Sequence, residues 1–217
     1  MLSPRYPRAP AKPPKSPMAL PPESVPAWIH PQGRKYLKQR GLTEEESKCY
    51  NLHFCDGGYW SQRIIIPMYE KDALVAFQGR DVTGSDPTRY RTEGPRPLYR
   101  PPWPPGDNFS SLVIVEGPFD AFAVLRAFPA VATLGNTPSS SQVSSIKQLC
   151  QTHAFTRVLV WYDSEAIGEA CALQLHLTPH IPTHVIIDEH RKDPGEYLCL
   201  DPAENVGHVI TSQLGTQ

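Results

Sequence analysis

The sequence predicts an α/β protein in which a parallel sheet flanked by helices follows a small α+β unit. Apolar runs alternate with helical segments after Ser111, and strands in such an alternation form a parallel sheet with right-handed crossovers. A last short helix is expected after Pro194, because proline suits the first helical position. The apolar runs lie at 112–115, 130–134, 158–162 and 184–187, and the helical segments at 119–128, 139–152 and 165–177.

The chain before this region predicts two short helices. Residues 28–50 have rough helical spacing of apolar side chains and indicate a helical hairpin. Gly41 stands where a glycine commonly ends a helix. Thr43 and Glu46 have the spacing of a capping box, in which each side chain accepts a hydrogen bond from the other residue's backbone.

Two β-rich runs follow, at 63–69 and 74–80, and the polar turn between them predicts a β-hairpin. Six prolines then lie between Pro95 and Pro105. Because proline interrupts both helices and strands, this connector is a plausible boundary between two subdomains.

The N-terminal segment is predicted to be disordered. Nine of the first 26 residues are proline, and the only charges before Glu23 are basic. Such a stretch indicates an extended basic tail or interdomain linker, with a weak electrostatic tether to nucleic acid as the alternative. The predicted organisation is a tail at 1–27, an α+β subdomain at 28–105, the parallel-sheet domain at 106–203 and a C-terminal tail at 204–217.

Composition limits the class of protein. The 217 residues include 21 Lys and Arg against 22 Asp and Glu, so net charge does not indicate a polyanionic partner. No apolar run is long enough to cross a bilayer and no secretory signal is evident, so we expect a cytoplasmic protein without a membrane partner. Five unpaired, widely spaced cysteines suggest free thiols, although Cys49, His53 and Cys55 leave zinc as a minor alternative.

Acidic side chains follow two of the predicted strands. Glu116 comes directly after the run ending at Val115, and Asp163 and Glu165 come after the run ending at Tyr162. In open α/β sheets, ligands bind beyond the carboxyl ends of the strands. Residues i and i+2 of an extended segment point the same way, so Asp163 and Glu165 are expected to reach one ion. Unpaired carboxylates repel one another there unless a cation joins them, which predicts a divalent metal site.

Two further aspartates leave alternatives open. Asp120 lies early in the helix after Glu116, where it is either a favourable N-terminal charge or part of the acidic site. Asp193 precedes the helix start at Pro194, so it is either an N-cap or a contributor to the metal site, and one side chain can serve both roles.

These residues resemble the TOPRIM domain, which bacterial-type primases, topoisomerases and several small nucleases share. A strand ends in Glu-Gly, another ends in an acidic pair separated by one residue, and a Lys-Asp-Pro segment follows. One departure is Glu165, which stands where the family usually has aspartate. The matching segments are 115–121, 132–135, 162–168 and 192–194.

The upstream half is similar to the N-terminal subdomain of the RNA-polymerase module of bacterial and phage primases. Its matching segments are 36–42, 63–67, 77–81, 89–90 and 98–99. The resemblance implies metal-dependent synthesis of RNA primers from NTPs on single-stranded DNA, with a replicative helicase as a possible partner and a phage or mobile element as a possible source. Mg²⁺ or Mn²⁺ would bind the acidic cluster and activate a 3′-hydroxyl for attack.

The resemblance also assigns roles to residues. Glu116, Asp163 and Glu165 are the implied catalytic residues, and together with Asp193 they are the implied metal ligands. A TOPRIM nuclease with the same metal cluster is one alternative, and Glu165 leaves open a second, a binding module with weak or no catalysis. Implied contacts to template or nucleotide come from the arginines Arg63, Arg80, Arg89, Arg91, Arg96 and Arg100.

Overall fold

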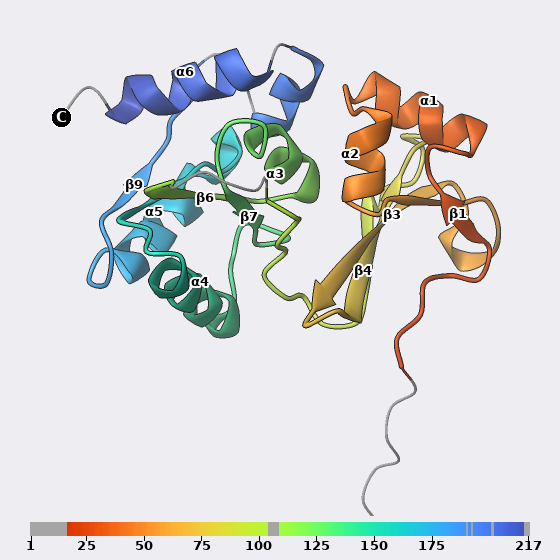
Figure 1. The fold of residues 1–217 in the computed structure, drawn as a ribbon, viewed down its shortest axis with the longest axis horizontal. Coiled ribbons are helices and arrows are strands. Elements are labelled where there is room, and N and C mark those ends of the chain that lie inside the picture. Colours follow the sequence, from red (N-terminus) through yellow and green to blue (C-terminus); the bar gives the residue numbers. More distant parts are fainter. Residues whose placement is uncertain (1–16, 104–108, 190, 192, 201, 215–217) are drawn as a thin grey trace, which may run out of the picture.

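Two sheets organise the chain in a computed structural model, which describes residues 17–103, 109–189, 191, 193–200 and 202–214. Figure 1 shows an N-terminal unit beside a C-terminal unit. The first is built on an antiparallel sheet of five strands and the second on a parallel sheet of four. Within the described part of the chain, no helix is long and apolar enough to span a membrane.

The N-terminal unit contains the predicted helical hairpin and the predicted β-hairpin. Its strands follow the order β1-β2-β3-β4-β5, and each pairs with its neighbour in antiparallel fashion. The elements are β1 (Ser24–Pro26), α1 (Pro31–Gln39), α2 (Glu44–Cys49), β2 (His53–Cys55), the 3₁₀ helix η1 (Gly58–Trp60), β3 (Arg63–Glu70), β4 (Ala73–Asp81) and β5 (Tyr90–Glu93).

The turn between α1 and α2 forms as the sequence predicts. Thr43 Oγ1 accepts a hydrogen bond from the Glu46 N–H at 3.2 Å, and Glu46 Oε2 accepts one from the Thr43 N–H at 2.8 Å. Gly41 has a φ of +73°, and a Cβ at this position would lie 2.0 Å from the Leu198 carbonyl oxygen. Glycine is therefore required here both by the backbone conformation and by the approach of the C-terminal unit.

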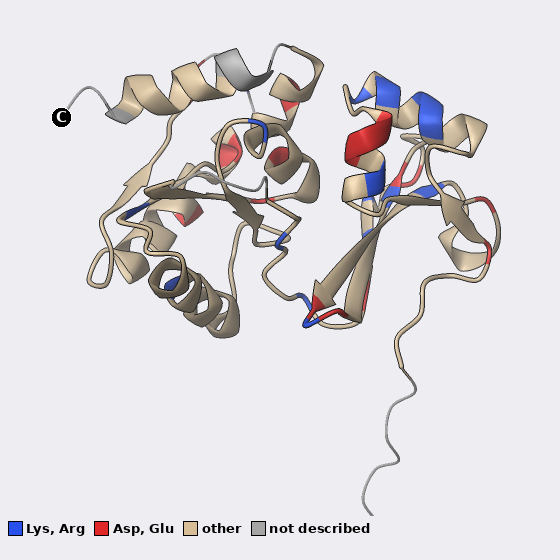
Figure 2. Ribbon diagram, viewed as in Figure 1, with Lys and Arg blue, Asp and Glu red and all other residues tan. Residues whose placement is uncertain are grey.

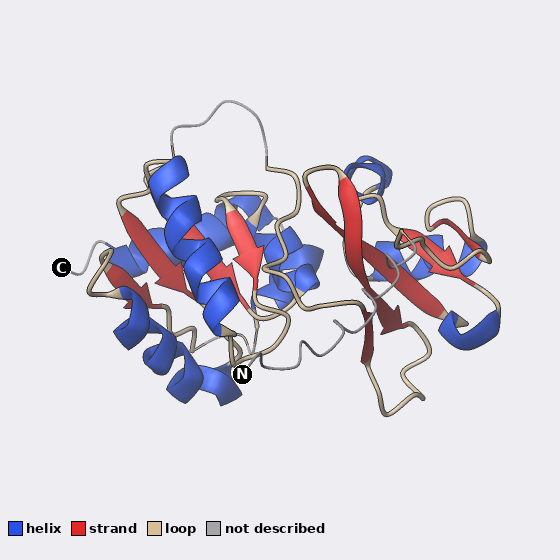
Figure 3. Ribbon diagram, turned by 90° about the horizontal axis from the view of Figure 1, so that it is seen from below, coloured by secondary structure: helices blue, strands red, loops and turns tan. Residues whose placement is uncertain are grey.

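The C-terminal unit is the predicted parallel sheet flanked by helices (Figure 3). Its strand order is β7-β6-β8-β9, and every neighbouring pair is parallel. The elements are β6 (Ser111–Val115), α3 (Pro118–Val124), β7 (Ala130–Ala132), α4 (Ser140–Thr152), β8 (Arg157–Val160), the 3₁₀ helix η2 (Ser164–Ala166), α5 (Ile167–Leu177), β9 (Thr183–Val185), the 3₁₀ helix η3 (Pro194–Cys199) and α6 (Pro202–Leu214).

The two predicted tails differ from the structure. Residues 17–27 do not form a tail, because β1 pairs with β2 at the edge of the antiparallel sheet; residues 1–16 lie outside the described residues. The predicted C-terminal tail is instead largely the helix α6. Val206 and Ile210 are four residues apart on one face of α6, and both are fully buried in the core. This apolar face stabilises the helix against α3 and η3.

The central strand β6 is buried on both faces. Val113 and Val115 pack in a core with α3 and α6, whereas Leu112 and Ile114 pack in a second core with α4 and α5. After β6 the chain crosses to β7 on one side and then to β8 on the other. Ligands bind at such a change of direction, beyond the carboxyl ends of the strands, so the topology places the candidate site after β6 and β8.

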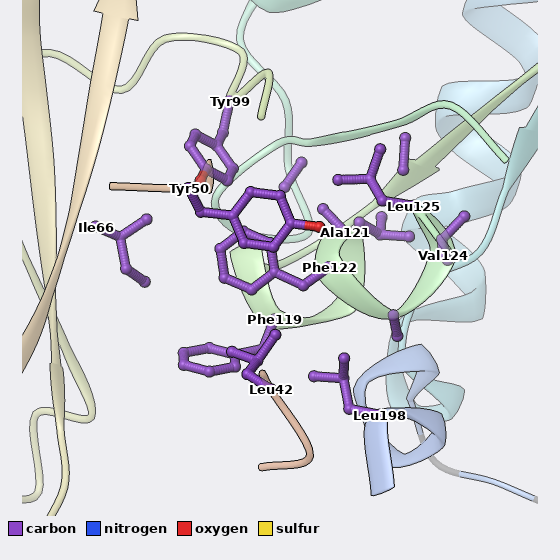
Figure 4. Packing of buried hydrophobic residues seen from close by; sticks show 14 of the residues in the cluster. Leu42, Tyr50, Ile66, Tyr99, Phe119, Ala121, Phe122, Val124, Leu125 and Leu198 are labelled. Atoms are coloured by element: carbon purple, nitrogen blue, oxygen red, sulfur yellow. The ribbon is translucent and has the colours of Figure 1, made fainter. Parts of the chain in front are cut away.

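One hydrophobic core joins the two units. Tyr50 of the N-terminal unit stacks on Phe122 of α3, with ring centroids 4.2 Å apart and planes 8° from parallel. Tyr36 and Tyr99 add edge-on contacts to Phe119 and Phe122, respectively. Figure 4 shows the rings of Tyr50, Tyr99, Phe119 and Phe122 with aliphatic side chains from both halves around them. The proline-dense connector therefore separates two sheets but not two cores.

Arg126 ties three segments together beside this core. Its Nε and Nη2 atoms donate to the two carboxylate oxygens of Glu46 at 2.6 and 2.8 Å. Its Nη2 also donates to the Gly41 carbonyl at 2.6 Å, and its Nη1 to the Leu198 carbonyl at 3.0 Å. Burial acts to raise the pKa of Glu46, but Arg126 and the cap at Thr43 outweigh it and lower that pKa.

We expect the Arg126→Met substitution to destabilise the fold by about 3 kcal/mol, because it removes the charged donor from a partly buried carboxylate and from two carbonyls. Urea denaturation measures the loss. The control is Lys48→Met, which removes an exposed i,i+4 pair with Glu44 and is expected to cost under about 0.5 kcal/mol. Equal losses in the two variants would contradict the role assigned to Arg126.

Candidate functional site

A cavity of about 400 Å³ lies between the two units. One wall is the carboxyl edge of the parallel sheet, and the other combines the end of α1 with polar side chains of β4 and β5. Figure 2 marks basic residues along α1 and acidic residues around α3 on the ribbon. The charged residues that line the cavity are Arg40, Arg80, Arg89, Arg96, Glu116, Asp120, Asp163 and Asp193.

Glu116 lies where the sequence predicts, directly after β6. Its Oε1 accepts a hydrogen bond from the Asp163 N–H at 3.0 Å, so the two strand ends are joined through this carboxylate. Burial raises the pKa of Glu116, and the neighbouring charges of Glu169 and Asp193 raise it further. The carboxylate is thus oriented by the backbone and placed among like charges.

Asp163 follows β8 and also faces the cavity. As the N-cap residue of η2 it makes no capping hydrogen bond through its side chain. Burial raises the pKa of Asp163 to about 7, with further contributions from Glu116, Asp193, Glu165 and Glu196. This carboxylate therefore experiences the repulsion that the sequence predicts for unneutralised acids at the strand ends.

Asp120 belongs to the acidic site and also orders the backbone around it. Its Oδ2 accepts a hydrogen bond from the Gly117 N–H at 2.8 Å, and its Oδ1 accepts one from the Gly195 N–H at 3.1 Å. A Cβ at Gly195 would lie 2.7 Å from Asp120 Oδ1, so glycine permits this close approach. Burial raises the pKa of Asp120 well above its usual range, and the charges of Asp193 and Asp163 add to the shift.

Asp193 caps η3 and lines the cavity at the same time. Its Oδ1 accepts a hydrogen bond from the Glu196 N–H at 3.0 Å, which is the capping role that the sequence allowed. Burial and the charge of Glu196 raise the pKa of Asp193, against an opposing effect of Arg40. Its second role, as a metal ligand, stays a prediction.

Glu165 does not share the position of Asp163. The sequence argument assumed an extended segment, but the chain turns into η2 immediately after Asp163. Because residues i and i+2 of a 3₁₀ turn do not point the same way, Glu165 is exposed and lies outside the cavity lining. Its charge still contributes to the raised pKa of Asp163.

Two charged residues near the site were not predicted. Glu169, in the first turn of α5, raises the pKa of Glu116 and accepts a hydrogen bond from Asn136 Nδ2 at 3.2 Å. Arg40, at the C-cap of α1, lies over the rings of Tyr36 and Phe119 and lines the cavity. Both look like ordinary helix-terminal charges in the sequence, and only the tertiary fold brings them to the acidic cluster.

Three of the six predicted arginines line the cavity: Arg80, Arg89 and Arg96. Arg80 is the most firmly held, because its Nε donates to the Tyr36 hydroxyl at 3.2 Å and its guanidinium lies 4.7 Å from the centre of the Tyr90 ring. Within the described part of the chain, none of these three or Arg40 forms an ion pair. Their charges face the cavity without a neutralising carboxylate in contact.

The other three predicted arginines lie elsewhere. Arg63 is 1% exposed and contacts Asp86 at 2.5 Å together with three backbone carbonyls, so it serves the fold. Arg91 pairs with the same aspartate at 2.8 Å. Arg100 lies over the Trp103 ring and contacts His153, beside a different hollow of the surface. All three have partners within the protein, and the predicted contact of these arginines with nucleic acid does not explain those partners.

The acidic cluster fits a hydrated divalent cation by its chemistry. Among the described residues, no three histidine, cysteine or acidic side chains are close enough to hold a metal directly. However, Mg²⁺ keeps several of its waters and needs only one or two carboxylates. Glu116, Asp163 and Asp193 offer oxygen donors in one cavity, and each has a raised pKa that a nearby cation would reverse.

The raised pKa of Asp163 predicts a pH dependence of stability in the presence of a chelator. Between about pH 4 and pH 7 the folded protein holds a proton on Asp163 that the unfolded chain has lost. The proton on Asp163 therefore contributes to the free energy of unfolding. This contribution is complete below about pH 4 and is lost as the pH rises through about 7. We expect Asp163→Asn to flatten the profile measured by urea denaturation, whereas Asp72→Asn, in the exposed β3–β4 turn, leaves it unchanged. An unaltered profile in Asp163→Asn would contradict the assignment.

One comparison with known proteins covers the strand ends that carry Glu116 and Asp163. Residues 111–187 match the family model of the Toprim domain, a span that runs from β6 through β9 and contains Glu116 and Asp163 but not Asp193. A solved structure described as a small TOPRIM domain protein from Bacillus stearothermophilus is 18% identical over 48% of this chain and 86% of that chain, with a TM-score of 0.32. A search of curated proteins found no match. Residues 111–187 of this chain thus form a Toprim domain.

Proposed function

We propose that the chain is a primase-type RNA polymerase module, which synthesises short RNA primers on single-stranded DNA in a metal-dependent reaction. The observation that carries this proposal is the shared cavity, in which Toprim carboxylates face four arginines from a separate antiparallel unit. A polymerase must hold the phosphates of a nucleotide beside the cations that neutralise them. The two walls of the cavity provide side chains for both tasks.

The acidic wall is suited to hold the cations. Glu116, Asp163 and Asp193 are the residues that would bind Mg²⁺ or Mn²⁺, which when bound neutralises phosphate oxygens and activates a hydroxyl for attack. Backbone contacts fix this wall in advance, since Glu116 is held by the Asp163 N–H and Asp193 by its cap on η3. Preorganised carboxylates of this kind need little rearrangement when a substrate arrives.

The basic wall is suited to hold phosphates and template. Arg40 and Arg80 lie against aromatic rings, which fixes their guanidinium groups at the cavity, and a planar guanidinium matches phosphate oxygens in pairs. Arg89 and Arg96 are exposed at the same wall, where they can follow the backbone of the template strand. We assign the first pair to the nucleotide and the second to single-stranded DNA.

A Toprim nuclease is the second candidate. The Toprim match covers residues 111–187, so it does not include the basic wall. The acidic cluster alone also suits hydrolysis of a phosphodiester. A third candidate is a module that binds nucleic acid without catalysis. The observation that favours it is the exposed position of Glu165. One assay separates all three.

We expect the protein, with single-stranded DNA, labelled NTPs and Mg²⁺ or Mn²⁺, to produce short RNA that Glu116→Gln and Asp163→Asn abolish. Glu45→Gln, which changes an exposed carboxylate of α2, should leave synthesis intact. Products resolved on a denaturing gel give the answer. Loss of the DNA without RNA synthesis would favour the nuclease, and neither product on a range of templates would favour the binding module.

The basic wall predicts a separate effect on the KM for NTPs. Removing one charge-assisted contact to phosphate costs about 1.5–3 kcal/mol, so Arg80→Met is expected to raise the KM for NTPs by roughly tenfold or more. Arg157→Met is the control, because Arg157 begins β8 at the opposite edge of the parallel sheet. Steady-state primer synthesis at varied NTP concentration measures both. Equal KM values for Arg80→Met and Arg157→Met would contradict the assignment of Arg80.

A further inference from the structure

A buried glutamine of the basic wall has half of its amide unpartnered. Gln78, in the middle of β4, is 4% exposed and lines the cavity. Its Nε2 donates to Thr92 Oγ1 at 3.2 Å, whereas its Oε1 is buried and has no hydrogen-bond partner among the described residues. A buried polar atom without a partner is costly, so its retention beside a cavity points to a ligand group that completes it.

The strand register places the Gln78 amide beside Arg80, the arginine that we assign to the nucleotide phosphates. Gln78 pairs with Thr92 of β5 and Arg80 pairs with Tyr90, so these four side chains share one face of the antiparallel sheet. Two residues along a strand span roughly 7 Å. A ligand with its phosphates at Arg80 therefore has room to place a hydrogen-bonding group about one sugar unit away, at Gln78.

A hydroxyl is the group that suits this position. An amide presents an acceptor at one end and donors at the other, and a hydroxyl satisfies either end because it both donates and accepts. The terminal torsion of a glutamine side chain is soft, so a small turn of the amide toward a hydroxyl in the cavity costs little and keeps its contact with Thr92. The neighbouring Thr92 hydroxyl holds the other end of the amide in place.

We propose that Gln78 selects ribonucleotides by hydrogen bonding to the ribose 2′-hydroxyl of a nucleotide whose phosphates lie at the arginines. The inference rests on the proposed function, which it deepens by naming the sugar of the substrate. A site that hydrogen-bonds a substrate hydroxyl rejects the analogue without it, because the buried polar group is then left unpaired. The 2′-hydroxyl is the chemical difference between ribonucleotides and deoxyribonucleotides.

Calorimetric titration of the full chain with ATP and with 2′-deoxy-ATP, both in Mg²⁺, tests the proposal. We expect the unmodified protein to bind ATP at least about tenfold more tightly than 2′-deoxy-ATP. Gln78→Met keeps the length of the side chain but removes its polar end, so ATP affinity should fall to the level of 2′-deoxy-ATP, whose own affinity should not change.

Thermal unfolding separates selection from a purely structural role. Without nucleotide, Gln78→Met should melt at the same temperature as the unmodified protein or higher, because it removes a buried oxygen that has no partner. Gln174→Met is the matched control: Gln174 Nε2 donates to the Thr183 carbonyl at 2.8 Å, remote from the cavity. That variant should melt at a lower temperature and keep the preference for ATP.

Several results would overturn the inference. Equal binding of ATP and 2′-deoxy-ATP by the unmodified protein would do so without any variant, as would binding of neither. An equal loss of both nucleotides in Gln78→Met would show a packing role instead. Where Gln78→Met does not fold, Thr92→Val should reduce the preference for ATP over 2′-deoxy-ATP. An unchanged preference in that variant would count against the proposal.

Failure of the inference and failure of the proposed function give different results. A protein that prefers ATP in the titration but makes no primers would contradict primase activity and leave the selection by Gln78 in place. A protein that makes primers equally well from NTPs and dNTPs would contradict the selection and leave the polymerase activity in place.

Discussion

The contact of Arg126 with Glu46, Gly41 and Leu198 is the constraint on which the site depends. It joins the end of α3 to the α1–α2 turn and to the last turn of η3 in one cluster of short hydrogen bonds. Two of the joined segments carry a residue of the cavity, since Arg40 directly precedes Gly41 and Asp193 is the N-cap of η3. The guanidinium group of Arg126, and the glycine that lets η3 approach, therefore contribute directly to the position of the basic wall relative to the acidic wall.

The common core makes that geometry rigid. Tyr50 stacks on Phe122, and Tyr36 meets both Phe119 and Arg80, so the aromatic side chains that fill the interface also position a charged group at the cavity. Large aromatic groups bury much apolar area and have few rotamers, which suits them to this role. The Toprim sheet supplies the carboxylates, but the packing between the units determines what those carboxylates face.

Much of the fold and part of the site could be predicted from local patterns. Glu116 and Asp163 were found because short apolar strands identify their own carboxyl ends. The arginines that reach the site were harder to predict, because alternation along a strand decides which face each side chain takes. Arg80 shares a face with Gln78, whereas Arg63 lies on the opposite face, packed against Gly79. Glu165 was misplaced because a 3₁₀ turn replaced the assumed extended segment. Arg40, Glu169 and the partners of Arg126 depend on contacts between distant segments, which no local pattern contains.

The two walls carry opposite charges yet form no ion pair with one another within the described residues. On the acidic wall, Asp120 and Asp193 are committed to backbone N–H groups, and Glu116 is tied to the Asp163 N–H, so none of these carboxylates can swing across the cavity without losing a bond. On the basic wall, Arg40 and Arg80 lie against aromatic rings. Keeping the charges apart costs stability, as the raised pKa values of the acids indicate. The same separation leaves cation-binding oxygens and anion-binding nitrogens available to one substrate, and a metal-bound nucleotide carries both complementary charges.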